Sequence, residues 1–157
     1  MTDSLFPDLM REPALERGEM AVHFSSATDL WATPQAVFDA LNAEFHFTLD
    51  ACASPENAKC SDFFSADDDG LRKDWRGTVW MNPPYSEVAD WMAKAYASAL
   101  AGAIVVCLIP SRTDTRWWHD YAMKGEIRFL RGRLRFGDAT NSAPFPSAVV
   151  VFKDGAL

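Results

Sequence analysis

The stretch that most constrains the fold is AIVVCLI at residues 103–109, an uninterrupted apolar run that Pro110 and Ser111 bring to an end. Such a run is typical of a strand in a parallel sheet that is buried on both faces. A strand with one solvent-exposed face alternates apolar and polar residues instead. Residues 78–81, TVWM, are also mostly apolar and end at two prolines. The pattern predicts an α/β domain with a mostly parallel sheet.

The length of 157 residues favours a single domain. Apolar residues at helical spacing predict a helix at 35–44, with Thr33 as its cap and Pro34 in its first turn. Residues 1–25 show no sustained period and are expected to form a partly ordered arm before a domain at 26–157. Further helices are expected at 87–101 and 115–121, and further strands at 47–53, 126–136 and 147–152.

Asn82-Pro83-Pro84-Tyr85 directly follows the strand at 78–81. The two prolines stiffen this turn, and open α/β sheets bind ligands at the carboxyl ends of their strands. The Asn82 side-chain oxygen and the Pro83 carbonyl could accept both hydrogens of an exocyclic amino group, and Tyr85 could stack on a base swung out of a duplex. The tetrapeptide resembles the catalytic motif of S-adenosylmethionine-dependent amino methyltransferases. An ordinary Asn-Pro turn is the structural alternative.

Two segments ahead of this motif are candidates for holding a methyl donor. The helix start after Thr33-Pro34 suits a carboxylate, because the first N–H groups of a helix and the positive end of its dipole attract anions. Residues 47–53 are predicted to form a short strand that ends in Asp50. The small Ala51 and Ala53 after it would let a nucleoside approach the backbone. A capped amphipathic helix and a surface aspartate are the structural alternatives.

The basic residues are unevenly distributed. A net charge of −7 argues against a protein that coats nucleic acid without selectivity. Residues 124–135, however, hold five lysines and arginines against Glu126 alone, and on a hairpin turning at Gly132 alternate arginines would share one face. A charged edge strand that resists aggregation is the alternative. The arginines expected to contact DNA are Arg112, Arg116, Arg128, Arg131, Arg133 and Arg135.

Composition also argues against other classes of protein. No apolar run is long enough to span a membrane, and the first residues lack the basic and apolar regions of a signal peptide, so a cytoplasmic protein is expected. Cys52, Cys60 and Cys107 lack metal-type spacing and are expected to be reduced thiols. The three histidines have no C-x-x-C companions, so no metal site is expected.

Several motifs occur in an order that is similar to one family. They are W-x-T-P at 31–34, F-x-L-D-A at 47–51, D-G-L at 69–71, N-P-P-Y-S at 82–86, L-I-P-S at 108–111, the tryptophan pair 117–118 and R-G-R-L-R-F at 131–136. Together they resemble the small phage-type DNA N6-adenine methyltransferases, often called Dam-like, over residues 28–153. The resemblance implies a trimmed Rossmann-like S-adenosylmethionine-dependent methyltransferase fold, with a mostly parallel sheet and an antiparallel C-terminal edge.

The resemblance also implies roles for individual residues. It assigns catalysis to Asn82, Pro83, Pro84 and Tyr85. It assigns contacts with S-adenosylmethionine to Trp31, Thr33, Pro34, Asp50, Ala51, Cys52, Asp69 and Leu71. It implies DNA as the substrate and a phage or prophage origin, hence the cytoplasm of a bacterial host. The usual glycine-rich cofactor loop is absent after Asp50, and the chain has no room for a separate target-recognition domain.

Other functions stay open at this point. The same tetrapeptide occurs in enzymes that methylate cytosine N4 or the side-chain amide of glutamine, and the arginine-rich segment favours a nucleic acid among these acceptors. A catalytically silent module that binds DNA or the cofactor, and a structural domain without a ligand, are alternatives from other classes. No oligomeric state follows from the pattern.

Overall fold

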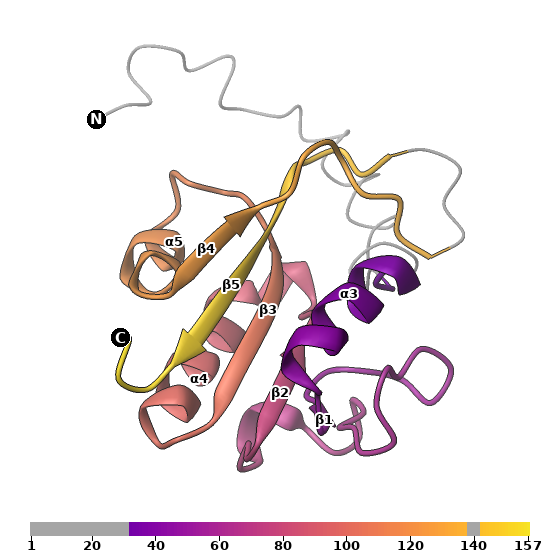
Figure 1. Ribbon diagram of the computed structural model, residues 1–157, viewed down its shortest axis with the longest axis vertical. Helices are drawn as coiled ribbons and strands as arrows, with labels where there is room; N and C mark the ends of the chain where they lie inside the picture. Colours follow the sequence, from indigo (N-terminus) through magenta and orange to yellow (C-terminus); the bar gives the residue numbers. More distant parts are fainter. Residues whose placement is uncertain (1–31, 138–141) are drawn as a thin grey trace. The chain divides into compact units, whose positions relative to one another are not determined.

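The computed structural model describes residues 32–137 and 142–157, and the expected arm at 1–25 and the cofactor candidate Trp31 lie outside them. These residues form an open five-stranded sheet with helices packed against it (Figure 1). The elements are α3 (Gln35–Phe45), β1 (Leu49–Asp50), β2 (Thr78–Met81), α4 (Val88–Leu100), β3 (Ile104–Pro110), α5 (Arg116–Asp120), β4 (Glu126–Phe129) and β5 (Ser147–Lys153).

The strands lie in the order β1-β2-β3-β5-β4. The pairs β1·β2 and β2·β3 are parallel, whereas β5 pairs antiparallel with both β3 and β4. β4 therefore runs in the same direction as the first three strands, and the one reversed strand, β5, lies inside the sheet. The expected parallel start is confirmed, and the two C-terminal strands do pair antiparallel.

The apolar run at 103–109 forms β3, which is buried on both faces as expected. Val105, Cys107 and Ile109 belong to the core on the side of α4, whereas Val106 and Leu108 belong to the core on the side of α3. This division follows from the two-residue period of a strand. On the α3 side, Phe38 packs edge-on against the β2 residue Trp80, with 5.5 Å between the ring centres. Helices on both faces explain the absence of a polar position in β3.

Four strands end at the same edge of the sheet, and β5 begins there. We call this the carboxyl edge and define it by the strand ends Asp50, Met81, Pro110 and Phe129 and by Ser147, which pairs with Pro110. In Figure 1 the arrowhead of β4 points to this edge and that of β5 points away from it. Every segment that follows one of these four strands therefore leaves the sheet at the carboxyl edge.

The expected strand at 126–136 is only partly formed. Glu126–Phe129 is β4, but residues 130–137 contain no strand, and no hairpin turns at Gly132. The reason is that β5 supplies the whole ladder for β4, from Glu126↔Val151 to Phe129↔Ala148. The prediction that alternate arginines share one face of a hairpin is therefore wrong, because the strand period ends before them.

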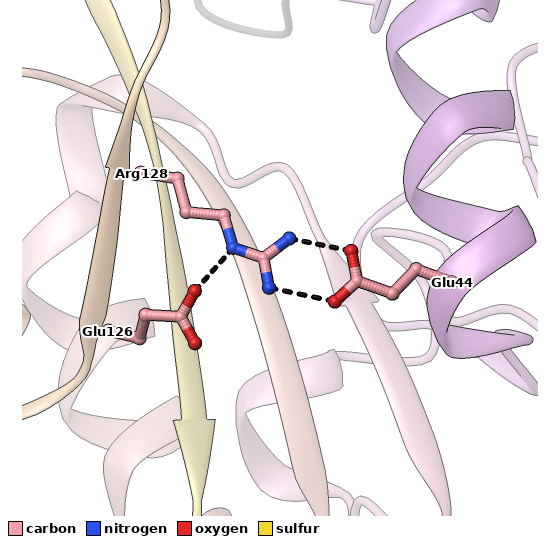
Figure 2. A network of polar contacts seen from close by, with 3 residues as sticks. All are labelled: Glu44, Glu126 and Arg128. Atoms are coloured by element: carbon pink, nitrogen blue, oxygen red, sulfur yellow. Dashed lines mark hydrogen bonds and ion pairs between the residues drawn. The ribbon is translucent and has the colours of Figure 1, made fainter.

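The edge strand β4 is tied to α3 by Arg128 (Figure 2). Its two terminal nitrogens donate to the two carboxylate oxygens of Glu44 at 2.7 and 2.8 Å, and its Nε donates to Glu126. The guanidinium also lies over the ring of Phe45, 5.3 Å from its centre. Two parallel hydrogen bonds between arginine and carboxylate are a strong and directional contact. The guanidinium of Arg128 is thus occupied by contacts within the protein.

Candidate active site

The side-chain amide of Asn82 is held from the start of α3. Thr33 is only 5% exposed, and its Oγ1 accepts a hydrogen bond from Asn82 Nδ2 at 2.9 Å. This bond fixes the nitrogen end of the amide, so the oxygen end faces away from Thr33. The prediction that Thr33 caps α3 is wrong, because Pro34 occupies the cap position and no side chain caps the helix. The hydroxyl of Thr33 instead accepts the hydrogen bond from Asn82.

The proline turn leads directly from β2 into α4. Pro83 and Pro84 are buried, and the Pro84 carbonyl accepts a hydrogen bond from the N–H of Glu87 at 3.0 Å. Residues Tyr85–Glu87 form a short 3-10 helix, and α4 follows at Val88. The turn is therefore rigid and lies at the carboxyl end of β2, next to the central strand β3.

Tyr85 belongs to an aromatic cluster at the carboxyl edge, with Phe136 and Phe145. Its ring meets Phe145 edge-on at 5.2 Å and Phe136 edge-on at 6.3 Å. The guanidinium of Arg112 lies 5.9 Å from the centre of the Phe145 ring. Burial raises the pKa of the Tyr85 phenol far above its usual value, so the hydroxyl stays neutral. Sequence reasoning missed Phe145, and the only signal was an aromatic residue between two prolines.

Asp50 organises the loop that follows β1. Its side chain is 2% exposed, and its two oxygens accept hydrogen bonds from the main-chain N–H groups of Cys52 at 3.3 Å and Lys59 at 3.0 Å. Burial raises the pKa of Asp50 to about 6, although these hydrogen bonds pull it back down. The buried carboxylate therefore stabilises the loop after β1 by binding two of its main-chain N–H groups. The sequence did not predict this role.

The Asp-Gly-Leu turn is brought against the same strand end. A Cβ added to Gly70 would lie 2.5 Å from the carbonyl oxygen of Ala51, so only glycine permits this approach. Ala51 is fully buried, Cys52 and Leu71 are half-buried, and Asp69 is exposed and paired with Arg72 at 3.2 Å. The structure thus joins two predicted cofactor segments and leaves Cys52, Asp69 and Leu71 as their accessible members.

The predicted DNA-binding arginines lie in two groups. Arg112 and Arg116 follow β3 and are exposed. Arg131, Arg133 and Arg135 follow β4, are exposed, and make no ion pair with another described residue. Both groups leave the sheet at the carboxyl edge. Arg128 differs, because Glu44 and Glu126 occupy its guanidinium.

The chain is similar to known proteins over most of its length. Residues 22–153 match the family described as DNA N-6-adenine-methyltransferase (Dam). The chain belongs to the Dam family. It is 32% identical over 144 residues to the DNA N-6-adenine-methyltransferase of Haemophilus phage HP1, covering 83% of this chain and 82% of that protein. The enzyme of the same name from Escherichia phage T1 is 34% identical over 152 residues, covering 80% of this chain and 63% of that protein.

Membership of the Dam family confirms the family predicted from the ordered motifs, and the five-stranded α/β sheet is compatible with a methyltransferase-like fold. Within residues 32–137 and 142–157, no group of three His, Cys, Asp or Glu side chains could hold a metal ion, and no helix is long and apolar enough to cross a membrane. Cys60 and Cys107 are free thiols.

A cavity of about 420 Å³ lies beside α3. None of the predicted catalytic or cofactor residues lines it. Its walls are Phe38, Asn42, Phe47, Thr48, Lys59, Cys60, Ser61 and Asp62.

Proposed function

We propose that this member of the Dam family transfers a methyl group from S-adenosylmethionine to the N6 amino group of adenine in DNA, at the carboxyl end of β2. The observation that carries the proposal is the Asn82 amide, which directly follows β2 and is oriented by the buried Thr33. An ordinary Asn-Pro turn does not require an asparagine held by a residue 49 positions away in the chain. This geometry favours a reacting group over a structural turn.

The residues of the turn hold the acceptor amino group. The Asn82 oxygen and the Pro83 carbonyl accept its two hydrogens, which draws the nitrogen toward a tetrahedral shape and frees its lone pair for attack. The cofactor, when bound, supplies a methyl group on a positively charged sulfur. As the new carbon–nitrogen bond forms, the carbon–sulfur bond breaks with its electron pair going to sulfur, and the nitrogen then releases one proton to solvent.

Tyr85 and its neighbours would receive the base. A target adenine must leave the stack before its amino group can reach Asn82. The aromatic cluster of Tyr85, Phe136 and Phe145 lies beside that turn, and Arg112 lies over Phe145. Aromatic side chains can stack on any of the four bases. An arginine beside the aromatic cluster can contact the adjacent phosphate.

The structure is compatible with a cofactor at the neighbouring strand end. Gly70 packs against the Ala51 carbonyl, which brings the two predicted cofactor segments together at β1, one strand away from Asn82. Cys52, Asp69 and Leu71 would contact the nucleoside, and Thr33-Pro34 would lie near the amino-acid end. Asp50 and Ala51 would support these contacts from within, because both are buried.

The arginines at the carboxyl edge would contact phosphates. Five of the predicted arginines are exposed, in segments that leave the sheet at the carboxyl edge, where Asn82 lies: Arg112, Arg116, Arg131, Arg133 and Arg135. Arg128 is better explained as the link between β4 and α3. Among the described residues, the segments that leave the carboxyl edge are the candidates for sequence preference.

The test is incubation of the protein with labelled S-adenosylmethionine and unmethylated DNA, followed by nucleoside analysis. We expect label in N6-methyladenine, and we expect Asn82→Ala to lower the rate by several orders of magnitude while the protein stays folded, because Asn82 acts on the amino group in the transition state. Label in N4-methylcytosine or in protein would identify a different acceptor. No transfer to any acceptor would identify a silent binding module.

A further inference from the structure

The most exposed large apolar side chain among the described residues is Phe129. It is 69% exposed, compared with 56% for Met123 and 50% for Leu100. Phe129 is the last residue of β4, so it lies at the carboxyl edge. Leu100 ends α4 and precedes the start of β3, so it lies at the opposite edge. Single exposed apolar residues are common on proteins, and the surroundings must decide whether one has a role.

The position of Phe129 explains why its ring is not covered. Side chains alternate along a strand, so Arg128 faces α3 while Ile127 and Phe129 face the side of α4. Ile127 packs against the core on that side. Phe129 is paired with Ala148 of β5, whose methyl group is too small to cover a ring, and the chain leaves the sheet at the next residue. The ring therefore projects beside the last rung of the ladder.

The part of the chain that contains Phe129 carries a charge opposite to that of the protein as a whole. Residues 110–137 contain seven lysines and arginines against three acids, although the net charge of the chain is −7. Glu126 and Glu44 are bound to Arg128, which leaves six lysines and arginines in these residues against Asp114 and Asp120. The chain continues from Phe129 into the segment that holds Arg131, Arg133 and Arg135, all three exposed and without an ion pair to another described residue. An exposed aromatic ring thus begins a cationic segment.

We propose that Phe129 contacts duplex DNA beside the target base, with its ring inserted at a base step and the three arginines on the adjacent phosphates. Three inter-strand spacings separate β2 from β4, or about 14 Å, which corresponds to roughly four base-pair steps. Phe129 would therefore contact DNA flanking the target and would not enter the space that the flipped base leaves. Apolar side chains that wedge between base steps bend DNA and enlarge the protein surface it contacts. The inference rests on the proposed function in taking DNA as the substrate.

The test measures binding of a labelled duplex at several salt concentrations. Phe129→Ala should weaken affinity by about 5- to 150-fold, the range for losing one contact between an aromatic ring and a base. The slope of log K against log salt should stay unchanged, because a ring neutralises no phosphate. Arg133→Ala should instead reduce that slope by about 0.9. Phe129→Trp should bind nearly as well as wild type, since it keeps a stacking face.

Leu100→Ala is the matched control, because it removes an exposed apolar side chain at the opposite edge of the sheet. We expect wild-type affinity from it. Equal affinities for Phe129→Ala and Leu100→Ala would overturn the inference. So would a loss of affinity in Phe129→Ala that follows the dissociation of a dimer, seen by light scattering, since Phe129 would then join two copies of this chain. If wild type itself neither binds nor methylates DNA, the proposed function fails, whereas normal wild-type activity with an unaffected Phe129→Ala refutes this inference alone.

Discussion

Replacing Thr33 by valine removes the hydroxyl that holds Asn82 and keeps the shape of the side chain. In the structure, Thr33 Oγ1 accepts the hydrogen bond of Asn82 Nδ2 at 2.9 Å, in a site where Thr33 is 5% exposed. The valine methyl group cannot accept this bond. The amide of Asn82 can then rotate and present its nitrogen, which is a donor, where the amino group of the base needs an acceptor.

The size of the effect follows from the value of one hydrogen bond. A net contribution of about 0.5–1.5 kcal/mol predicts a similar loss of unfolding free energy. If the same energy keeps Asn82 in its reactive orientation, the rate of methyl transfer should fall about two- to tenfold, since roughly 1.4 kcal/mol corresponds to a factor of ten. Thr33→Ser keeps the hydroxyl and should restore most of both.

The assay separates this role from the cofactor contact predicted for Thr33. Single-turnover rates at saturating cofactor report the orientation of Asn82, and calorimetry reports the affinity for S-adenosylmethionine. We expect a lower rate and a nearly unchanged affinity for Thr33→Val. In urea unfolding, Thr33→Val and Asn82→Ala should be coupled, because each removes the same bond. An unchanged rate with weakened cofactor binding, or purely additive unfolding energies, would refute the reasoning.

Three further predictions concern the same edge. Tyr85→Phe should change the rate only slightly, because the ring and not the neutral hydroxyl packs in the aromatic cluster; a large loss in steady-state turnover would assign the hydroxyl a role. Gly70→Ala should reduce the free energy of unfolding by about 1–3 kcal/mol, because its Cβ would collide with the Ala51 carbonyl, and an unchanged urea midpoint would contradict this close packing. The Asp50 pKa is raised from 3.8 to about 6, so the folded state binds the proton more tightly than the unfolded state. Wild type should therefore lose stability relative to Asp50→Asn as the pH rises through this window, by roughly 3 kcal/mol, and parallel pH profiles of the two proteins would show that Asp50 does not titrate there.

Much of the fold could be predicted from local patterns. The apolar run of β3 and the helical spacing of α3 and α4 each determined an element with nearly the right bounds. The hairpin at 126–136 was wrong because alternation of apolar and basic residues shows that a segment can be a strand, not which strand it will pair with. β5 provides the ladder for β4, and that choice depends on residues about twenty positions further along the chain.

The place of the Asn-Pro-Pro-Tyr motif in the fold could be predicted, but the contacts of the candidate site residues could not. The tetrapeptide indicated its own place at a strand end, because prolines end strands and carboxyl ends of strands gather at one edge. The bond from Asn82 to Thr33 joins residues 49 positions apart, and a threonine before proline looks like a helix cap in the sequence. In the same way, Asp50 was expected to face a ligand, whereas burial and two main-chain donors turn its carboxylate toward its own loop.

The reversed direction of β5 determines where a fused module would be placed. Lys153 pairs with Ile104, the first residue of β3, so the last strand delivers the chain to the edge opposite the site. A DNA-recognition module joined behind this strand would begin one strand length from the carboxyl edge, about 23 Å for the seven residues of β5. A linker would need at least about seven extended residues to bring the module to the DNA side. A shorter linker would instead keep an affinity tag or a fluorophore clear of the substrate.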